Sequence, residues 1–213
     1  MSPQEEVTFE CEDFELEGVL HIPEGKVRRT LKVVVCHPHP VFGGSMENIL
    51  VVCICEAVAG RGVEALRFNF RGVGASGGFH NGGVGEVGDV LSAIRYLRKG
   101  RKTVKVGLAG YSFGASMAVL AAKKDKTIEK VATVALPLRL IDIGPPPTKR
   151  PRILLIAGKS DLVAPISELE FFAKASKGKA LLEPISGSDH FFGGKMQFVG
   201  KLVADFLVGP SKE

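Results

Sequence analysis

The sequence predicts an α/β protein with a mostly parallel sheet of about eight strands and helices on both faces of that sheet. Two observations carry this prediction. From residue 31 to residue 207, short apolar runs alternate with segments of helical length, and such alternation is typical of a parallel sheet covered on both sides. Within the first thirty residues, apolar and polar side chains alternate, which indicates an antiparallel N-terminal hairpin.

The predicted hairpin turns at Glu12 and Asp13. Its two strands carry alternating apolar residues, namely Val7, Phe9 and Cys11 before the turn and Phe14, Leu16 and Leu20 after it.

Six further strands are predicted from short apolar runs. The run LKVVVC is continuous and rich in β-branched residues, which is the composition of a strand buried on both faces of a sheet. The six predicted strands are residues 31–36, 65–70, 104–110, 131–137, 152–158 and 179–185.

Five helices are predicted between and after these strands. In residues 86–99 the apolar positions fall on one side of a helix, namely Val87, Val90, Leu91, Ile94 and Leu97. The last helix has a similar inner face, formed by Met196, Val199, Leu202, Val203 and Phe206. The five predicted helices are residues 46–60, 86–99, 115–124, 166–176 and 195–207.

A chain of 213 residues is long enough for one core and short for two domains. We therefore expect residues 1–213 to form a single domain. Only 14 residues separate the strands predicted at 131–137 and 152–158, which leaves no room there for a separate lid domain.

The composition is that of a soluble globular protein, with 45% hydrophobic and 24% charged residues. The first residues, MSPQEEVTFE, are acidic and lack the basic region and apolar stretch of a signal peptide. Four cysteines fit a compartment in which thiols stay reduced. We therefore expect a cytoplasmic protein that does not associate with a membrane.

The net charge of +5 comes largely from basic runs at residues 98–105, 123–130 and 149–152. These runs fall between predicted elements, mostly at helix ends, where cations suit the helix dipole. Aromatic residues for base stacking are not interleaved with them. We interpret the runs as solvated surface and expect no nucleic-acid partner.

Two short patterns resemble parts of metal sites. Cys53 and Cys55 form a C-x-C, but residues two apart on a helix point in nearly opposite directions, so packed core thiols are favoured over a zinc site. His37-x-His39 follows a strand, as in metal-dependent barrel amidohydrolases, but that fold needs a longer chain. We expect no metal.

Residues 72–77 read GVGASG, a literal G-x-G-x-x-G after a strand. A dinucleotide fingerprint must open directly into a helix whose N-terminus holds the pyrophosphate. Here Phe79, His80 and Asn81 follow more glycines instead, so we expect no nucleotide cofactor.

The run Gly110-Tyr111-Ser112-Phe113-Gly114 lies between a predicted strand and a predicted helix. In a G-x-S-x-G turn the serine sits in strained backbone geometry, which leaves no space for side chains two positions away. The five residues alone are a weak pattern, and their place between strand and helix makes Ser112 the candidate nucleophile.

A serine nucleophile needs a base, and the base needs a carboxylate to orient it. Asp161 follows the strand at 152–158, and His190 follows the strand at 179–185. This order and placement suit a Ser112–Asp161–His190 triad on a parallel sheet. Asp189 is a competing acid, but its position next to His190 in the chain makes Asp161 the better candidate.

An acyl-transfer site also needs two backbone amides for the developing oxyanion. Phe113, which follows the candidate nucleophile, would supply one amide, and the loop after the strand at 31–36 would supply the other. Prolines 38 and 40 have no N–H, so Val41 or Phe42 is the nearest candidate. Aromatic residues near these motifs predict an open apolar pocket, formed by Phe42, Phe79, Tyr111, Phe191 and Phe192.

Five motifs together resemble the α/β-hydrolase superfamily and, more narrowly, its small lidless branch of hydrolases with HPHP-x-FGG and NFRGVG-x-S. These motifs are HPHPVFGGSMEN, LRFNFRGVGASGG, GYSFGAS, GKSDLVAP and SDHFF. The resemblance covers almost the whole chain and implies an α/β-hydrolase sheet of about eight strands without a lid domain. It carries the roles of nucleophile, acid and base onto Ser112, Asp161 and His190. Many members have aspartate where Asn69 stands, which we interpret as a structural position.

The function expected from these residues is that of a serine hydrolase, which cleaves an ester or thioester of a small-molecule acyl substrate through an acyl-enzyme on Ser112. Two alternatives remain open, namely a non-catalytic binding or partner subunit on a hydrolase scaffold, and an amidase or peptidase. The residues do not indicate acyl length, leaving group or oligomeric state.

Overall fold

The computed structural model describes residues 2–25, 30–101 and 103–210. These residues contain one eight-stranded sheet in the order β1-β2-β4-β3-β5-β6-β7-β8. The strands are β1 Gln4–Cys11, β2 Phe14–His21, β3 Leu31–Cys36, β4 Glu64–Phe68, β5 Lys105–Tyr111, β6 Lys130–Val134, β7 Arg152–Gly158 and β8 Ala180–Ile185.

Only β2 runs against the direction of the other described strands. It pairs antiparallel with β1 on one side and with β4 on the other, whereas every remaining pair is parallel. The predicted antiparallel hairpin and mostly parallel sheet are therefore confirmed.

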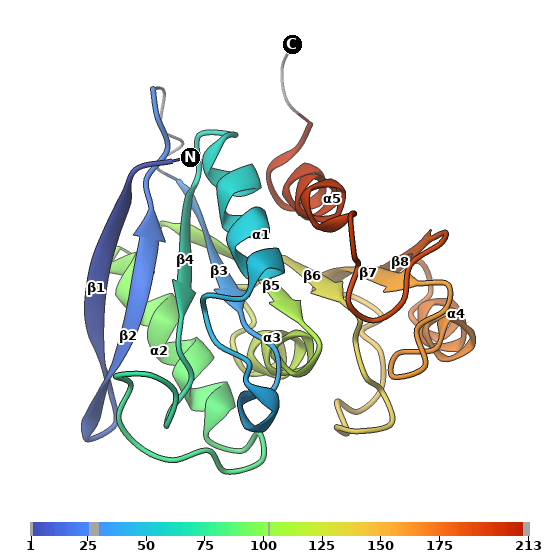
Figure 1. Ribbon diagram of the computed structural model, residues 1–213, viewed down its shortest axis with the longest axis horizontal. Coiled ribbons are helices and arrows are strands. Elements are labelled where there is room, and N and C mark those ends of the chain that lie inside the picture. The colour runs from blue at the N-terminus through green and yellow to red at the C-terminus, as the bar shows by residue number, and fades with distance from the viewer. Residues whose placement is uncertain (1, 26–29, 102, 211–213) are drawn as a thin grey trace.

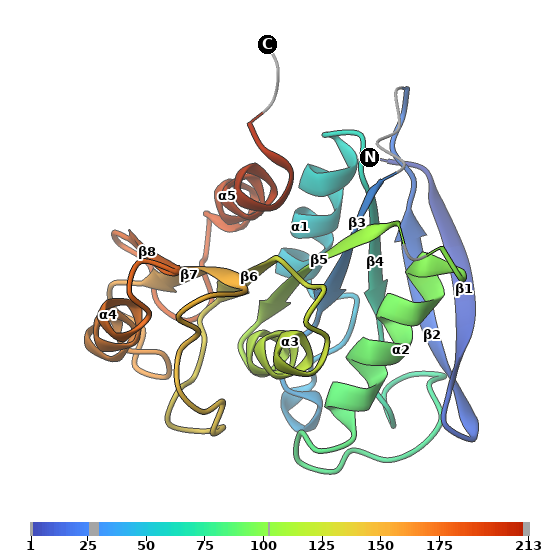
Figure 2. The same cartoon turned by 180° about the vertical axis from the view of Figure 1, so that it is seen from behind.

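Helices cover both faces of the sheet. Helices α1 and α5 pack on one face, and α2, α3 and α4 pack on the other, as the front and back views show (Figure 1, Figure 2). The described helices are α1 Ile49–Ala59, α2 Glu86–Arg98, α3 Phe113–Lys124, α4 Ile166–Ala175 and α5 Met196–Val208, with a 3₁₀ turn, η1, at Pro40–Phe42.

The continuous apolar strands divide their side chains between two cores. In β3, Val33 and Val35 face the core under α1 and α5, while Val34 and Cys36 face the core under α2, α3 and α4. All four are fully buried. A side chain of this size contributes about 1.5–3 kcal/mol when it leaves water, so burial on both faces selects apolar residues at every position of the strand.

Element boundaries differ from the predictions by a few residues, for local reasons. Helix α1 begins at residue 49 rather than 46 because Asn48 caps it, accepting a hydrogen bond from the Leu50 amide at 3.0 Å. Strand β6 ends at Val134 because Ala135 has a φ of 51°, which an extended strand does not allow. Strand β4 ends at Phe68, and the amide of Phe70 donates to the His37 side chain instead of a neighbouring strand.

The parallel strands all end at the same edge of the sheet, and the loops that follow them meet there. Ser112 follows β5, Asp161 follows β7 and His190 follows β8. The connection between β6 and β7 is an irregular loop with no helix or strand of its own. In open α/β sheets this edge is where ligands bind, so the fold brings the candidate residues to one place. Among the described residues, no helix is both long and apolar enough to cross a membrane.

Candidate active site

Ser112 occupies a tight turn between β5 and α3. Its backbone has φ 53° and ψ −117°, a conformation that costs of order 1–3 kcal/mol and persists only where the surroundings impose it. The flanking glycines show what imposes it. A Cβ at Gly110 would lie 2.2 Å from the Gly114 carbonyl oxygen, and a Cβ at Gly114 would lie 2.4 Å from the carbonyl oxygens of Cys36 and His37. The turn therefore presses against the end of β3 and needs glycine at both positions.

Three side chains from three separate loops form a hydrogen-bonded line. His190 Nε2 lies 3.1 Å from the hydroxyl oxygen of Ser112. On the other side of the ring, His190 Nδ1 lies 2.9 Å from Asp161 Oδ2 and 3.1 Å from Oδ1. With the proton on Nδ1, which Asp161 favours, Nε2 is free to accept the hydroxyl proton of Ser112. This is the geometry that activates a serine hydroxyl.

Asp161 is held as an anion by its surroundings. Its carboxylate is fully buried, and its Oδ1 accepts hydrogen bonds from the amides of Val163 and Ala164, each at 2.8 Å. Burial by itself raises the pKa of Asp161, but the hydrogen bonds from His190 and from these two amides outweigh it and leave the pKa below its usual value. The negative charge is therefore present at neutral pH to stabilise a protonated His190.

Tyr111 and Phe192 support the loop that carries His190. The Tyr111 hydroxyl donates to the His190 carbonyl oxygen at 3.0 Å, and the two rings lie 5.6 Å apart. Burial, followed by the nearby charges of Asp161 and Asp189, raises the pKa of Tyr111 to about 12. Its phenol therefore stays protonated and keeps donating. Phe192 packs edge-on against Tyr111 at 6.4 Å.

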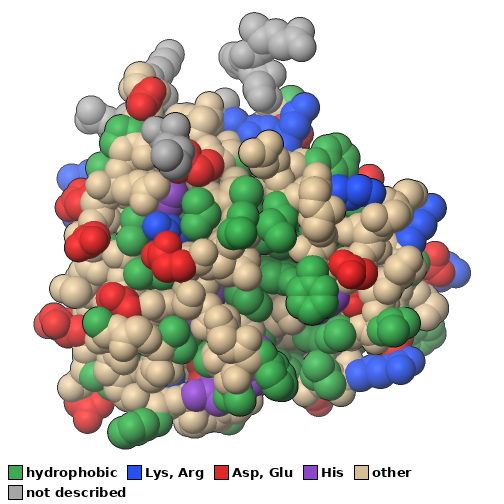
Figure 3. All heavy atoms as spheres, in the orientation of Figure 1, with side chains coloured by type: hydrophobic (Ala, Val, Ile, Leu, Met, Phe, Trp, Pro, Cys, Tyr) green, Lys and Arg blue, Asp and Glu red, His purple; other side chains and the backbone are tan. Residues whose placement is uncertain are grey.

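A cavity of about 640 Å³ opens beside Ser112. Its polar side chains are few, namely those of His39, Asn48, Tyr111, Ser112 and His190, whereas most of its walls are apolar. The apolar walls come mainly from Phe42, Pro137, Leu140, Ile141, Val163 and Phe191. No aspartate, glutamate, lysine or arginine of the described residues lines it. Figure 3 shows hydrophobic side chains that extend from the region over α1 towards the loop that precedes α5.

The structure brings some of the predicted pocket residues to this cavity and excludes others. Phe42, Tyr111 and Phe191 line it. Phe192 does not, because a φ of 55° turns the next ring after Phe191 into the core, where it is fully buried. Phe79 does not line it either and is 88% exposed.

Sequence reasoning missed four residues of the apolar wall. Pro137, Leu140 and Ile141 belong to the irregular loop after β6, and Val163 belongs to the loop after β7. Leu140 and Ile141 carry neither a periodic pattern nor a motif. Pro137 ends the predicted strand at 131–137 and Val163 lies in GKSDLVAP, but neither pattern marks its residue as part of a pocket wall. The only signal for the wall is that these loops follow strands of the same sheet.

The amides expected to complete an oxyanion hole are placed differently from the prediction. Phe113 supplies the first amide of α3, which has no carbonyl within the helix to donate to. The amide of Val41, however, donates to His39 Nδ1 at 3.2 Å, and the amide of Phe42 donates to the His39 carbonyl oxygen at 3.1 Å. Val41 also lies outside the cavity lining. Both candidate donors are thus engaged within η1.

The backbone amide of His39 is left without a partner among the residues that the structure describes. His39 lines the cavity beside Ser112 and Phe113, and its ring lies 4.8 Å from that of Phe113. Of the lining residues in the loop after β3, Phe42, Gly43 and Gly44 have engaged amides, so among the described residues His39 is the one with a backbone amide still able to donate.

The two histidines that resembled a metal pair have separate environments. His37 is fully buried, accepts from the Phe70 amide at 3.1 Å through Nε2 and donates to the Pro38 carbonyl oxygen through Nδ1 at 2.6 Å. His39 faces the cavity instead.

No cluster of three or more metal-ligating side chains occurs within the described part of the chain. Cys55 is buried, which raises the pKa of its thiol and keeps it protonated.

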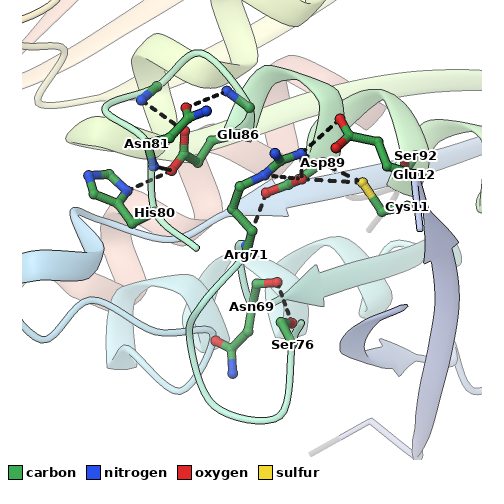
Figure 4. Close-up of polar contacts among 12 residues, drawn as sticks. Cys11, Glu12, Asn69, Arg71, Ser76, His80, Asn81, Glu86, Asp89 and Ser92 are labelled. Carbon is green, nitrogen blue, oxygen red and sulfur yellow. Dashed lines mark hydrogen bonds and ion pairs between the residues drawn. The ribbon is translucent and has the colours of Figure 1, made fainter. Parts of the chain in front are cut away.

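The glycine-rich segment after β4 forms a loop that α2 holds in place (Figure 4). Residues 72–77 do not open into a helix, since α2 begins at Glu86. At the base of the loop, the Ser76 hydroxyl donates to the Asn69 carbonyl oxygen at 2.8 Å. The Asn69 side chain is buried, accepts from the Met46 amide at 2.8 Å and donates to Glu17 at 2.6 Å. These contacts are those of a structural residue.

Comparison with known proteins identifies a matching family and similar folds. A model of the X-Pro dipeptidyl-peptidase (S15) family matches residues 10–142, which is more than half of the chain. The uncharacterized protein RP471 of Rickettsia prowazekii is 29% identical over 186 residues, which are 82% of this chain and 77% of that protein.

Two solved structures superpose over almost the entire chain. An α/β serine hydrolase homologue from Coxiella burnetii has a TM-score of 0.86 and 29% identity, covering 98% of this chain and 99% of that one. XC6422 from Xanthomonas campestris, described as an α/β serine hydrolase without a lid, has a TM-score of 0.85 and 27% identity, covering 95% and 93%. From the family match and the shared fold, this chain belongs to the X-Pro dipeptidyl-peptidase (S15) family and has the α/β-hydrolase fold.

Proposed function

We propose that this chain is a serine hydrolase that cleaves esters or thioesters of uncharged, apolar acyl groups through an acyl-enzyme on Ser112. The observation that carries the proposal is the hydrogen-bonded line from Ser112 through His190 to Asp161, at 3.1 Å and 2.9 Å, beside an apolar cavity.

In the proposed reaction, the Ser112 oxygen attacks the acyl carbonyl carbon while its proton passes to His190 Nε2. Asp161 stabilises the imidazolium that forms. The amides of Phe113 and His39 donate to the carbonyl oxygen as it becomes an oxyanion, in place of the Val41 or Phe42 amide expected from the sequence. His190 then returns the proton to the leaving alkoxide or thiolate as the tetrahedral intermediate collapses. Water, activated by the same histidine, releases the acid and restores Ser112.

The lining of the cavity favours an uncharged ester or thioester over an X-Pro peptide. A dipeptidyl-peptidase must hold the N-terminal ammonium of its substrate, and burying an unpaired charge is costly. None of the charged side chains in the described residues lines this cavity. Asp161 is buried and already bonded to His190. The apolar walls instead suit an acyl chain, because apolar area leaves water there.

The first test is ester hydrolysis by the wild type and by two serine variants. We expect turnover of p-nitrophenyl acetate, butyrate and octanoate, labelling of Ser112 by a fluorophosphonate, and little release of p-nitroaniline from Gly-Pro-p-nitroanilide. Ser112→Ala should lower kcat by at least about 1000-fold and abolish labelling, because it removes the attacking oxygen.

The matched control is Ser116→Ala, one turn further along α3. Ser116 is buried and its hydroxyl makes no hydrogen bond to any described residue, so its loss should leave turnover near the wild-type rate. Equal ester turnover by wild type and Ser112→Ala would contradict the proposal and favour a non-catalytic binding protein. Faster cleavage of the X-Pro amide than of every ester would favour a peptidase.

A further inference from the structure

The loop between β3 and α1 is organised around one residue, His39. Its carbonyl oxygen accepts from the amides of Phe42 and Gly44, at 3.1 Å and 3.0 Å. Its side chain caps η1 by accepting from the Val41 amide through Nδ1 at 3.2 Å. The carbonyl oxygen and Nδ1 of His39 are therefore both used within the turn, whereas its backbone amide donates to none of the described residues.

The backbone around His39 has little freedom. Pro38 precedes it and Pro40 follows it, and a residue before proline is restricted to extended backbone. His39 has φ −58° and ψ 123°, which fits that restriction. Gly44 closes the turn so tightly that a Cβ there would lie 2.2 Å from the Pro38 carbonyl oxygen.

The imidazole of His39 is also clamped by three aromatic rings. Its centroid lies 4.8 Å from that of Phe113, 5.0 Å from that of Phe42 and 5.1 Å from that of His80. Phe113 follows the candidate nucleophile, so the ring ties the β3 loop directly to the start of α3.

His80 is anchored in turn. Its Nδ1 lies 2.6 Å from Oε1 of Glu86, a fully buried carboxylate that also accepts from the amides of Asn81 and Gly83 at 2.9 Å and 2.8 Å (Figure 4). The loop after β4 thus supports the loop after β3 through the contact between the two histidine rings.

We propose that His39 is a positioning residue: by capping η1 through Nδ1 and packing on Phe113, its side chain fixes the His39 backbone amide beside the Phe113 amide as the second oxyanion donor. This inference rests on the proposed function. One oxyanion donor accounts for about 100–1000-fold in kcat, and an amide cannot be deleted by side-chain substitution. The side chain that holds the amide can be changed.

The cap requires an unprotonated Nδ1. Burial lowers the pKa of His39, and the neighbouring His80 lowers it further, although Glu86 opposes this. The imidazole is therefore neutral at pH 7 and able to accept the Val41 amide.

Three substitutions of His39 distinguish the contribution of its cap hydrogen bond from that of its aromatic ring. His39→Asn keeps a cap acceptor without the ring, because asparagine caps such turns through its side-chain oxygen. His39→Phe keeps a ring without the acceptor, and His39→Ala lacks both. We expect kcat for p-nitrophenyl butyrate to fall about 10–100-fold in His39→Ala and His39→Phe with KM within about threefold, and His39→Asn to recover most of the loss.

Binding of an acyl trifluoromethyl ketone, which forms a tetrahedral oxyanion on the serine, should weaken in parallel with kcat. If the His39 side chain had only a structural role, its substitution would lower Tm, but inhibitor binding and kcat would not weaken together. Wild-type kcat in His39→Ala, or full activity in His39→Phe together with loss in His39→Asn, would overturn the positioning role.

The Ser112→Ala variant distinguishes this failure from failure of the proposed function. Esterase activity that disappears in Ser112→Ala but stays at the wild-type level in His39→Ala overturns only the inference about His39. Activity that persists in Ser112→Ala overturns the proposed function. Melting temperatures of all variants show which are folded, and His39→Asn and His39→Phe keep the test decisive if His39→Ala does not fold.

Discussion

At the carboxyl end of β7, Gly158 lies against the backbone of the loop that carries His190. A Cβ at Gly158 would lie 2.4 Å from the carbonyl oxygens of both Ser188 and Asp189. The Ser160 amide donates to the same Ser188 carbonyl oxygen at 3.0 Å. The loops after β7 and β8, which carry Asp161 and His190, are thus in direct backbone contact, and the absence of one side chain permits it.

We expect Gly158→Ala to displace the Ser188–His190 segment and to lower kcat for p-nitrophenyl butyrate by roughly 100-fold, since a shift of about 1 Å in a catalytic group has an effect of this size. The matched control is Gly193→Ala in the same loop region, where a new Cβ would have no heavy atom within 4 Å. Turnover that falls equally in both variants would contradict the packing argument.

At the scale of elements, α2 holds the loop that follows β4. Its Asp89 is fully buried and accepts from the backbone amide of Arg71 at 3.0 Å and from its guanidinium at 2.9 Å and 2.7 Å. The same guanidinium reaches Glu12, which is 58% exposed, at 3.1 Å (Figure 4). One arginine therefore has a buried partner on α2 and an exposed partner in the hairpin.

We expect Asp89→Ala to lower the free energy of unfolding by about 3–5 kcal/mol, because it leaves the buried guanidinium of Arg71 without its buried partner. Glu12→Ala removes the exposed partner of the same group and should cost less than about 1 kcal/mol. Guanidinium chloride unfolding curves of the two variants measure the difference. Equal losses of unfolding free energy in the two variants would contradict the argument that the buried Arg71–Asp89 pair matters more than the exposed Arg71–Glu12 pair.

At the scale of the whole molecule, buried histidines link global stability to pH. Burial lowers the pKa of His37 from 6.5 to about 4, against a smaller opposing effect of its bond to Pro38. The pKa of His21 is also lowered, by burial and then by Arg67. A lowered pKa means that the unfolded chain takes up the proton first as the pH falls. The contribution to stability is therefore complete above pH 6.5 and is lost on the way down to about pH 4.

Between pH 7 and pH 4.5 we expect the wild type to lose about 2–3 kcal/mol of unfolding free energy through His37 alone. His37→Asn removes this titrating group, so its stability should be lower at pH 7 but should decrease less over the same interval. Urea unfolding at the two pH values measures the decrease in unfolding free energy for each protein. An identical decrease in the wild type and in His37→Asn would contradict the assignment to His37.

Much of the architecture could be predicted because it depends on local patterns. Continuous apolar runs such as 31–36 become strands buried on both faces, and one-sided apolar spacing such as that in 86–99 becomes a helix against the sheet. Ser112, Asp161 and His190 were identifiable because each lies within a few residues of the end of a strand, and parallel strands end at one edge. The turn at Glu12–Asp13 likewise predicted the hairpin.

By itself, then, the sequence determined the order of strands and helices and the three side chains brought to that edge, since spacing along the chain carries both. Only the tertiary structure decided which neighbours surround Ser112. It turned Phe192 into the core, supplied Leu140 and Ile141 as a wall, and engaged the Val41 and Phe42 amides with His39. The physical reason is that these contacts join irregular loops far apart in the chain, and hydrogen bonds and packing between such loops leave no periodic trace in the residues that make them.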